Sequence, residues 1–132
     1  MACSDQPATV STQESGLTEI KRDLSEDRQV EAVLVRSDGG TLVATGDLVF
    51  LVLPGTKITR SMINEASFRA DYAENLDVKW LKDKRLLISY DKARIFHFSN
   101  FWHSGEISNW NYMVELAIKP ANLDKQLSTY YD

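Results

Sequence analysis

The chain has little of what many small proteins depend on for stability or chemistry. Among its 132 residues there are one cysteine, two histidines and three prolines. A single cysteine cannot form an internal disulfide, so a disulfide scaffold is excluded. The hydrophobic fraction of 43% is sufficient for an ordinary core in one domain of this length. We therefore expect a single domain that needs neither a disulfide nor a metal to fold.

Long apolar runs and basic clusters are also scarce. The longest apolar run, Leu48 to Leu53, has six residues, whereas a membrane-spanning helix needs about 20. The formal net charge is −4, and the only local group of basic residues is Lys82, Lys84 and Arg85. Nucleic-acid binding requires a basic face. The composition therefore argues against a nucleic-acid partner and against a spanning helix.

The one cysteine lies where a lipid could be attached. Cys3 follows Ala2 and precedes a polar tract over residues 4–13. Ala-Cys-Ser is what remains of a bacterial lipoprotein signal when its apolar segment is removed and a start methionine is supplied. This interpretation predicts a lipid-anchored protein on the periplasmic side of a bacterial membrane, in contact with the membrane only through the anchor. Two alternatives stay open: a spare exposed thiol, or a chain that starts at Met1 and is cytoplasmic.

Composition divides the chain into three parts. Residues 1–16 are polar and predict a disordered tether, and residues 121–132 predict a loosely held tail. Between them, residues 17–120 predict a β-rich globular domain. A near-helical spacing of Leu17, Ile20 and Leu24 allows at most one short turn of helix, followed by a tight turn at residues 25–28.

Alternating apolar residues and turn signals predict the strands. The pattern indicates a first strand over 29–36, a turn at 38–40 and a returning strand over 41–45. The continuous apolar run at 48–53 indicates a central strand covered on both faces. Residues 58–75 fit a helix or a strand equally well. Further strands are predicted over residues 78–90 (a hairpin), 93–101 and 112–119.

Together these elements predict the fold class. Strands joined mainly by short turns favour a mainly β domain, with a single antiparallel sheet folded as a small sandwich or partly open barrel and at most one short helix. The apolar side of the alternation should be buried. These positions are Trp80, Leu86, Ile88, Val114, Leu116 and Ile118.

The densest group of aromatic residues lies in residues 96–103, followed by Trp110 and Tyr112. One hypothesis is a binding surface for a protein or a glycan, formed by Trp102, Trp110 and Tyr112 with His103. Aromatic side chains with polar tips are favoured at interfaces because they contribute a large contact area at small entropic cost. The alternative is that these rings fill a second small core beneath the loop at 103–109.

No pattern in the chain predicts catalysis, a metal site or a cofactor. His97 and His103 lie six residues apart, without the tighter ligand pairs of a zinc site. Ser99 lies near His97 but lacks the Gly-x-Ser-x-Gly elbow of a hydrolase. The glycines are not followed by the Lys-Ser/Thr of a phosphate-binding loop. We therefore expect a protein that is not an enzyme and that uses no cofactor or metal.

The hairpin region carries a resemblance to known proteins. From Val78 to Phe101 the chain reads Val-Lys-Trp, a turn, Leu-Leu-Ile-Ser-Tyr and then Ala-Arg-Ile-Phe-His-Phe. With the turn at residues 25–27 before the first strand, this resembles a group of small bacterial proteins, often lipoproteins, over residues 24–119. The resemblance implies a cell-envelope lipoprotein and transfers no activity or functional residue. The hairpin is also similar to one blade of a β-propeller, but the chain has no repeat at a period of about 40 residues.

These observations favour a binding or interaction role. Two other classes remain open on the sequence alone: a cytoplasmic immunity-type or inhibitor protein, and a small hydrolase directed at the cell wall. An apolar segment ending in Leu-x-Ala-Cys, encoded upstream of Cys3, would support the lipoprotein over the cytoplasmic protein.

Overall fold

The computed structural model describes residues 16–37 and 46–120, and every structural statement below concerns these residues. Several sequence expectations lie outside them: lipid attachment at Cys3, the tether up to residue 15, the turn and returning strand in the segment 38–45, and the C-terminal tail 121–132.

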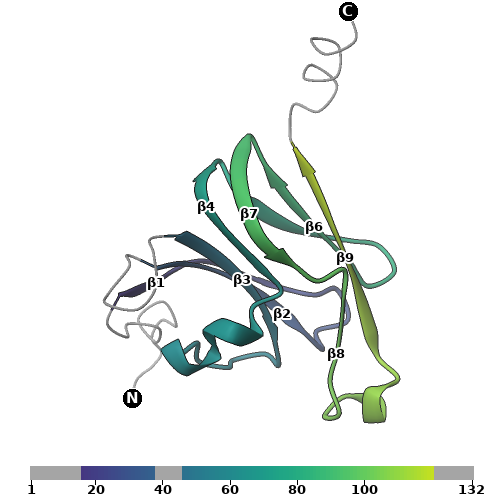
Figure 1. Ribbon diagram of the computed structural model, residues 1–132. Coiled ribbons are helices and arrows are strands. Elements are labelled where there is room, and N and C mark those ends of the chain that lie inside the picture. The colour runs from purple at the N-terminus through teal and green to yellow at the C-terminus, as the bar shows by residue number, and fades with distance from the viewer. Residues whose placement is uncertain (1–15, 38–45, 121–132) are drawn as a thin grey trace, which may run out of the picture.

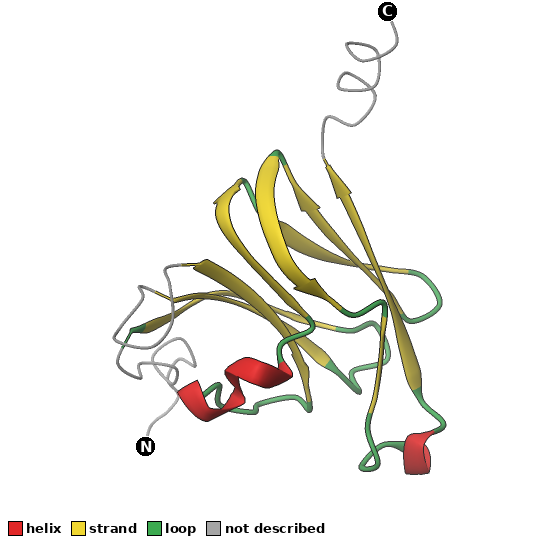
Figure 2. Cartoon of the chain, viewed as in Figure 1, coloured by secondary structure: helices red, strands yellow, loops and turns green. Residues whose placement is uncertain are grey.

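The described residues form two β-sheets (Figure 1). The first has five antiparallel strands in the order β1 (Leu17–Leu24), β2 (Glu31–Ser37), β3 (Gly46–Val52), β4 (Phe68–Glu74) and β7 (Lys92–Phe98). The second has the order β5 (Asp77–Leu81), β6 (Arg85–Tyr90), β9 (Met113–Pro120) and β8 (Phe101–His103). In this part of the chain the helical elements are two short 3-10 segments, η2 (Arg60–Glu65) and η3 (Ser108–Trp110) (Figure 2). The mainly β fold is confirmed.

One strand pair runs in an unexpected direction. β6 and β9 are parallel, with Leu86 opposite Leu116, whereas short turns predict antiparallel neighbours. The cause is the path after β6. Asp91 already donates its backbone N–H to the carbonyl of Glu74 at 2.8 Å, so β7 begins in the first sheet beside β4 rather than beside β6. The chain then returns through β8 to place β9 along β6.

The main core lies between the two sheets. The alternation places Leu86, Ile88, Val114 and Leu116 in this core, each at most 3% exposed. Trp80 and Ile118 are partly buried and pack against the same cluster. The face predicted for these strands is therefore confirmed.

A second apolar cluster covers the other face of the five-stranded sheet. In β3, Val49 faces the main core while Leu48 and Phe50 face this second cluster. Ile58 and Ile63, from the segment that contains η2, pack over it. The central strand covered on both faces is thus confirmed, and the ambiguous stretch 58–75 proves to be a short helix followed by a strand.

The turn of helix that the sequence allowed at residues 17–24 is a strand instead. β1 pairs with β2 along its length, and its register shifts between Glu19 and Lys21. That bulge breaks the period-2 alternation, so the apolar spacing imitates a helix. The tight turn that follows is confirmed, because the backbone N–H of Arg28 donates to the carbonyl of Ser25 at 2.9 Å.

Candidate binding surface

The structure separates the four residues predicted to form a binding surface. His103 is exposed and Trp110 is 55% exposed. Tyr112 is only 8% exposed, and Trp102 is partly buried against the main core. Trp102 and Tyr112 are thus corrected from surface to core residues. The physical reason is the alternation itself: Trp102 lies opposite Val114 in the β8–β9 pair, and Tyr112 has the same parity as Val114.

Tyr112 joins β9 to the turn after β1. Its hydroxyl donates to Oδ2 of Asp27 at 2.5 Å, and Lys84 Nζ lies 4.7 Å from its ring. Burial and the hydrogen bond to Asp27 raise the pKa of Tyr112 to about 12. Burial alone would raise the pKa of Asp27, but hydrogen bonds from Tyr112 and Ser25 outweigh it and lower that pKa. The phenol therefore stays neutral and the carboxylate ionised at neutral pH, as a structural pair requires.

The loop between β8 and β9 is fixed from within. The carbonyl of Ser104 accepts from the backbone N–H groups of Ile107, at 3.3 Å, and Trp110, at 3.2 Å. Its hydroxyl oxygen accepts from the N–H of Glu106 at 3.1 Å. Ile107 is 7% exposed and belongs to the main core. The loop is therefore anchored, and its outward side chains are held in place.

Trp110 is held outward at a conformational cost. Asn109 and Trp110 both have positive φ, 52° and 75°, a region that residues with a Cβ rarely adopt. The indole also lies directly on Gly105, where an added Cβ would come within 2.7 Å of the ring. Any larger residue there would require the indole to shift. A strained backbone and a close contact with Gly105 thus hold a ring that remains 55% exposed. Such strain is a pattern seen at functional positions.

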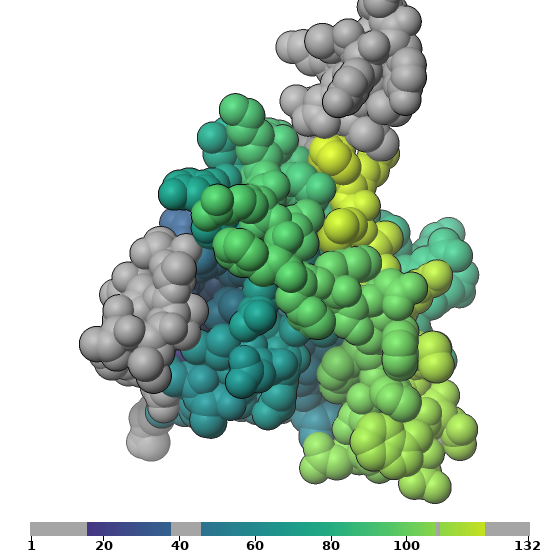
Figure 3. Space-filling model, in the orientation of Figure 1, coloured from purple at the N-terminus to yellow at the C-terminus, as the bar shows by residue number. Residues whose placement is uncertain are grey.

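Three rings and a methionine form one outer surface, which we call the outer aromatic surface: Phe101, His103, Trp110 and Met113. The ring centroids of His103 and Trp110 are 4.8 Å apart, and those of Phe101 and His103 are 5.5 Å apart, both in edge-to-face geometry. Met113 lies opposite His103 in the strand pair. Phe101 is 47% and Met113 52% exposed. Figure 3 shows this part of the chain, in yellow-green, as a projecting part of the molecule.

Sequence reasoning missed two members of this surface. Phe101 shares the face of His103 because they are two apart in β8, so strict alternation would have found it. Met113 alternates with the predicted core residue Val114, but sequence reasoning did not connect it to the aromatic group. The antiparallel pairing of β8 with β9 is what brings Met113 beside His103.

His97 lies in β7, and Ser99 follows the end of that strand. Within residues 16–37 and 46–120, no group of three or more His, Cys, Asp or Glu side chains is arranged to hold a metal ion. The hydroxyl of Ser99 donates to the carbonyl of Phe101 at 3.0 Å, so it is engaged with the backbone rather than with His97.

None of the helices in the described ranges has the length and apolar character needed to cross a bilayer.

Comparison with protein-family models, with curated proteins and with solved structures finds no significant match to this chain.

Proposed function

We propose that this chain is a protein-binding module whose outer aromatic surface docks a partner protein. The observation that carries the proposal is Trp110, a largely exposed indole held outward by a strained backbone over Gly105. Tryptophan is enriched among the residues that dominate binding energy at protein interfaces. Met113 adds a flexible, polarisable contact that adapts to a partner.

The arrangement of the rings favours a protein over a glycan at this surface. The interplanar angles are 64° for His103 and Trp110, and 62° for Phe101 and His103. Adjacent rings therefore present edges and notches rather than one flat face. A sugar ring stacks on a flat aromatic face, whereas notches between rings accept protruding side chains of a protein. Shape complementarity of this kind is typical of protein interfaces.

Replacing Trp110 with glycine should remove binding and leave the fold intact. Glycine adopts φ 75° without strain, so the free energy of unfolding should not fall by more than about 0.5 kcal/mol. Loss of a central tryptophan should weaken partner binding roughly 30-fold or more. Denaturant unfolding measures the first quantity, and titration with the purified partner measures the second.

The partner can be found and the surface tested in one design. A photo-crosslinking amino acid at Met113, in the cells that produce the protein, should give a discrete adduct that disappears in the Trp110→Gly background. The same amino acid at Lys57, which is exposed beside the second cluster, is the matched control and should give no such adduct. An adduct at Met113 that persists without Trp110, or none at all, would contradict the proposal.

We further propose that the module is displayed from a membrane by lipid on Cys3. Support comes from Ala2-Cys3-Ser4 and the polar tract behind it, and from the resemblance of the hairpin region to envelope lipoproteins. In the full-length gene product, Cys3→Ser should move the protein from the membrane fraction to the soluble fraction, because a thioether-linked lipid requires sulfur. Cys3→Ser protein still retained by membranes would rule the anchor out.

A further inference from the structure

A second strained aromatic residue, Tyr72, lies in β4 of the five-stranded sheet and is not part of the outer aromatic surface. Tyr72 has φ 53° and lies where the register between β4 and β7 shifts, between Asp71 and Glu74. Its side chain is 77% exposed, so packing does not compensate for the strain. Bulges of this kind re-aim a side chain and are common beside functional sites.

An arginine is fixed beside this ring. Arg94 donates from Nε and Nη2 to the two carboxylate oxygens of Asp71, at 2.8 and 2.6 Å. The carboxylate is only 10% exposed, and the two parallel bonds orient the guanidinium. The guanidinium carbon of Arg94, Cζ, lies 4.9 Å from the ring centroid of Tyr72 and 5.5 Å from that of Phe96. The Arg94 side chain is 62% exposed.

A second arginine–aspartate pair, joined by a single hydrogen bond, borders the same hollow. Arg36 donates from Nε to Oδ1 of Asp47 at 2.9 Å, and the Asp47 side chain is 6% exposed. Both ion pairs and Tyr72 line a hollow of about 620 Å³, which is within the range of small-ligand sites. The charges in the lining cancel, because two arginines face two aspartates.

We propose that this hollow binds an uncharged carbohydrate, with one sugar ring stacked on Tyr72. The balanced charges give no net attraction for an anion or a cation. The side chains of Arg36 and Arg94 are 57% and 62% exposed, and their oriented guanidinium N–H groups are donors that match the oxygens of sugar hydroxyls. The exposed ring of Tyr72 supplies the apolar face that the C–H groups of a sugar require. This inference uses residues outside the outer aromatic surface and stands independently of the protein-binding proposal.

The test is an NMR titration of the full chain labelled with ¹⁵N. The probes are three neutral trisaccharides, cellotriose, maltotriose and the trimer of N-acetylglucosamine, and inorganic phosphate is titrated separately. At least one trisaccharide should shift the amide signals around Tyr72 and Arg94 in a saturable way, and phosphate should not.

Two variants decide whether the hollow is responsible. Tyr72→Gly keeps the fold, because glycine accepts φ 53°, and should weaken trisaccharide binding at least about tenfold. Arg94→Lys loses the bidentate pairing with Asp71 and should also weaken trisaccharide binding at least about tenfold. Arg85→Lys is the matched control, because the exposed ion pair of Arg85 with Glu115 lies outside this hollow, and this variant should bind the sugar as the unaltered chain does. Shifts with phosphate alone, no shifts with any trisaccharide, or unchanged sugar binding by Tyr72→Gly would each overturn the proposal.

Discussion

Replacing Leu116 with alanine should lower the free energy of unfolding by about 2–5 kcal/mol. Leu116 lies in β9, directly opposite Leu86 of β6, and is 3% exposed in the main core between the sheets. Removing three carbons there forfeits burial and leaves a cavity that rigid sheets on either side refill only in part. Urea unfolding followed by tryptophan fluorescence measures the loss as a lower midpoint.

The matched control is Met113→Ala in the same strand. Met113 points to the opposite side and is 52% exposed, so its truncation should change the free energy of unfolding by less than about 0.5 kcal/mol. Equal losses in the two variants, or a Leu116→Ala loss below half a kcal/mol, would contradict the face assigned to β9.

The side-chain faces of the strands were predictable from the sequence because they depend on local periodicity. In β5, β6 and β9 the alternation of apolar and polar residues has a period of two, and a buried face permits only one register. The continuous apolar run of β3 is equally local evidence. This run indicates that both faces of β3 are buried, and in the structure the main core and the second cluster cover them.

The arrangement of the strands was not predictable in the same way. β7 follows β6 after a single residue, yet it pairs with β4 in the other sheet. Choosing between those partners depends on contacts far apart in the sequence, and no local pattern records them. The bulge in β1 is a further case, because one extra residue converts a strand alternation into an apparent helical spacing.

The candidate surface was predicted only in part. The aromatic cluster was visible in the sequence, but the division between core and surface depends on the parity of each residue in its strand. Trp102 and Tyr112 point inward by parity. Trp110 escapes this rule because it lies in a loop, where the positive φ values of Asn109 and Trp110 aim the side chain outward. Sequence periodicity carries no information about such backbone angles.

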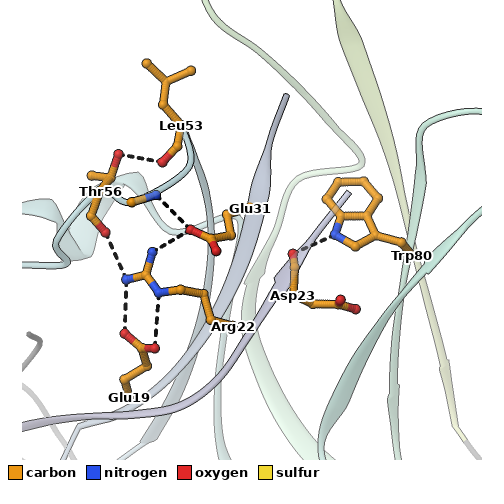
Figure 4. A network of polar contacts seen from close by, with 8 residues as sticks. Glu19, Arg22, Asp23, Glu31, Leu53, Thr56 and Trp80 are labelled. Carbon is orange, nitrogen blue, oxygen red and sulfur yellow. Dashed lines mark hydrogen bonds and ion pairs between the residues drawn. The ribbon is translucent and has the colours of Figure 1, made fainter. Parts of the chain in front are cut away.

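Replacing Arg22 with methionine should lower the free energy of unfolding by about 3–5 kcal/mol. Arg22 donates to both carboxylate oxygens of Glu19, to Glu31 and to the carbonyl of Thr56 (Figure 4). The side chains of Arg22, Glu19 and Glu31 are only 13%, 7% and 15% exposed. Burial alone would lower the pKa of Arg22, but its bonds to the two glutamates outweigh burial and raise it. Without the guanidinium, two carboxylates are left close together with little water.

The control for Arg22 is an arginine whose ion pair is exposed. Arg85 pairs with Glu115 at 3.0 Å, and these side chains are 59% and 66% exposed. Arg85→Met removes the same charge and should cost at most about 1 kcal/mol, because water screens such pairs. Chemical unfolding of both variants at one pH and ionic strength gives the comparison. A loss for Arg22→Met no larger than that for Arg85→Met would contradict a structural role for the buried network.

A triple variant separates the two sources of the loss. If unpaired carboxylates cause the instability of Arg22→Met, adding Glu19→Gln and Glu31→Gln should restore much of the lost free energy of unfolding. Neutral amides carry no charge to desolvate. The amide oxygen at position 31 can still accept from the N–H of Gly55, which now donates to Glu31 at 2.9 Å. If the lost contacts of the guanidinium itself cause the instability, the triple variant should be no more stable than Arg22→Met. We expect partial recovery, because the bond from Arg22 to Thr56 on the turn after β3 is lost in both variants.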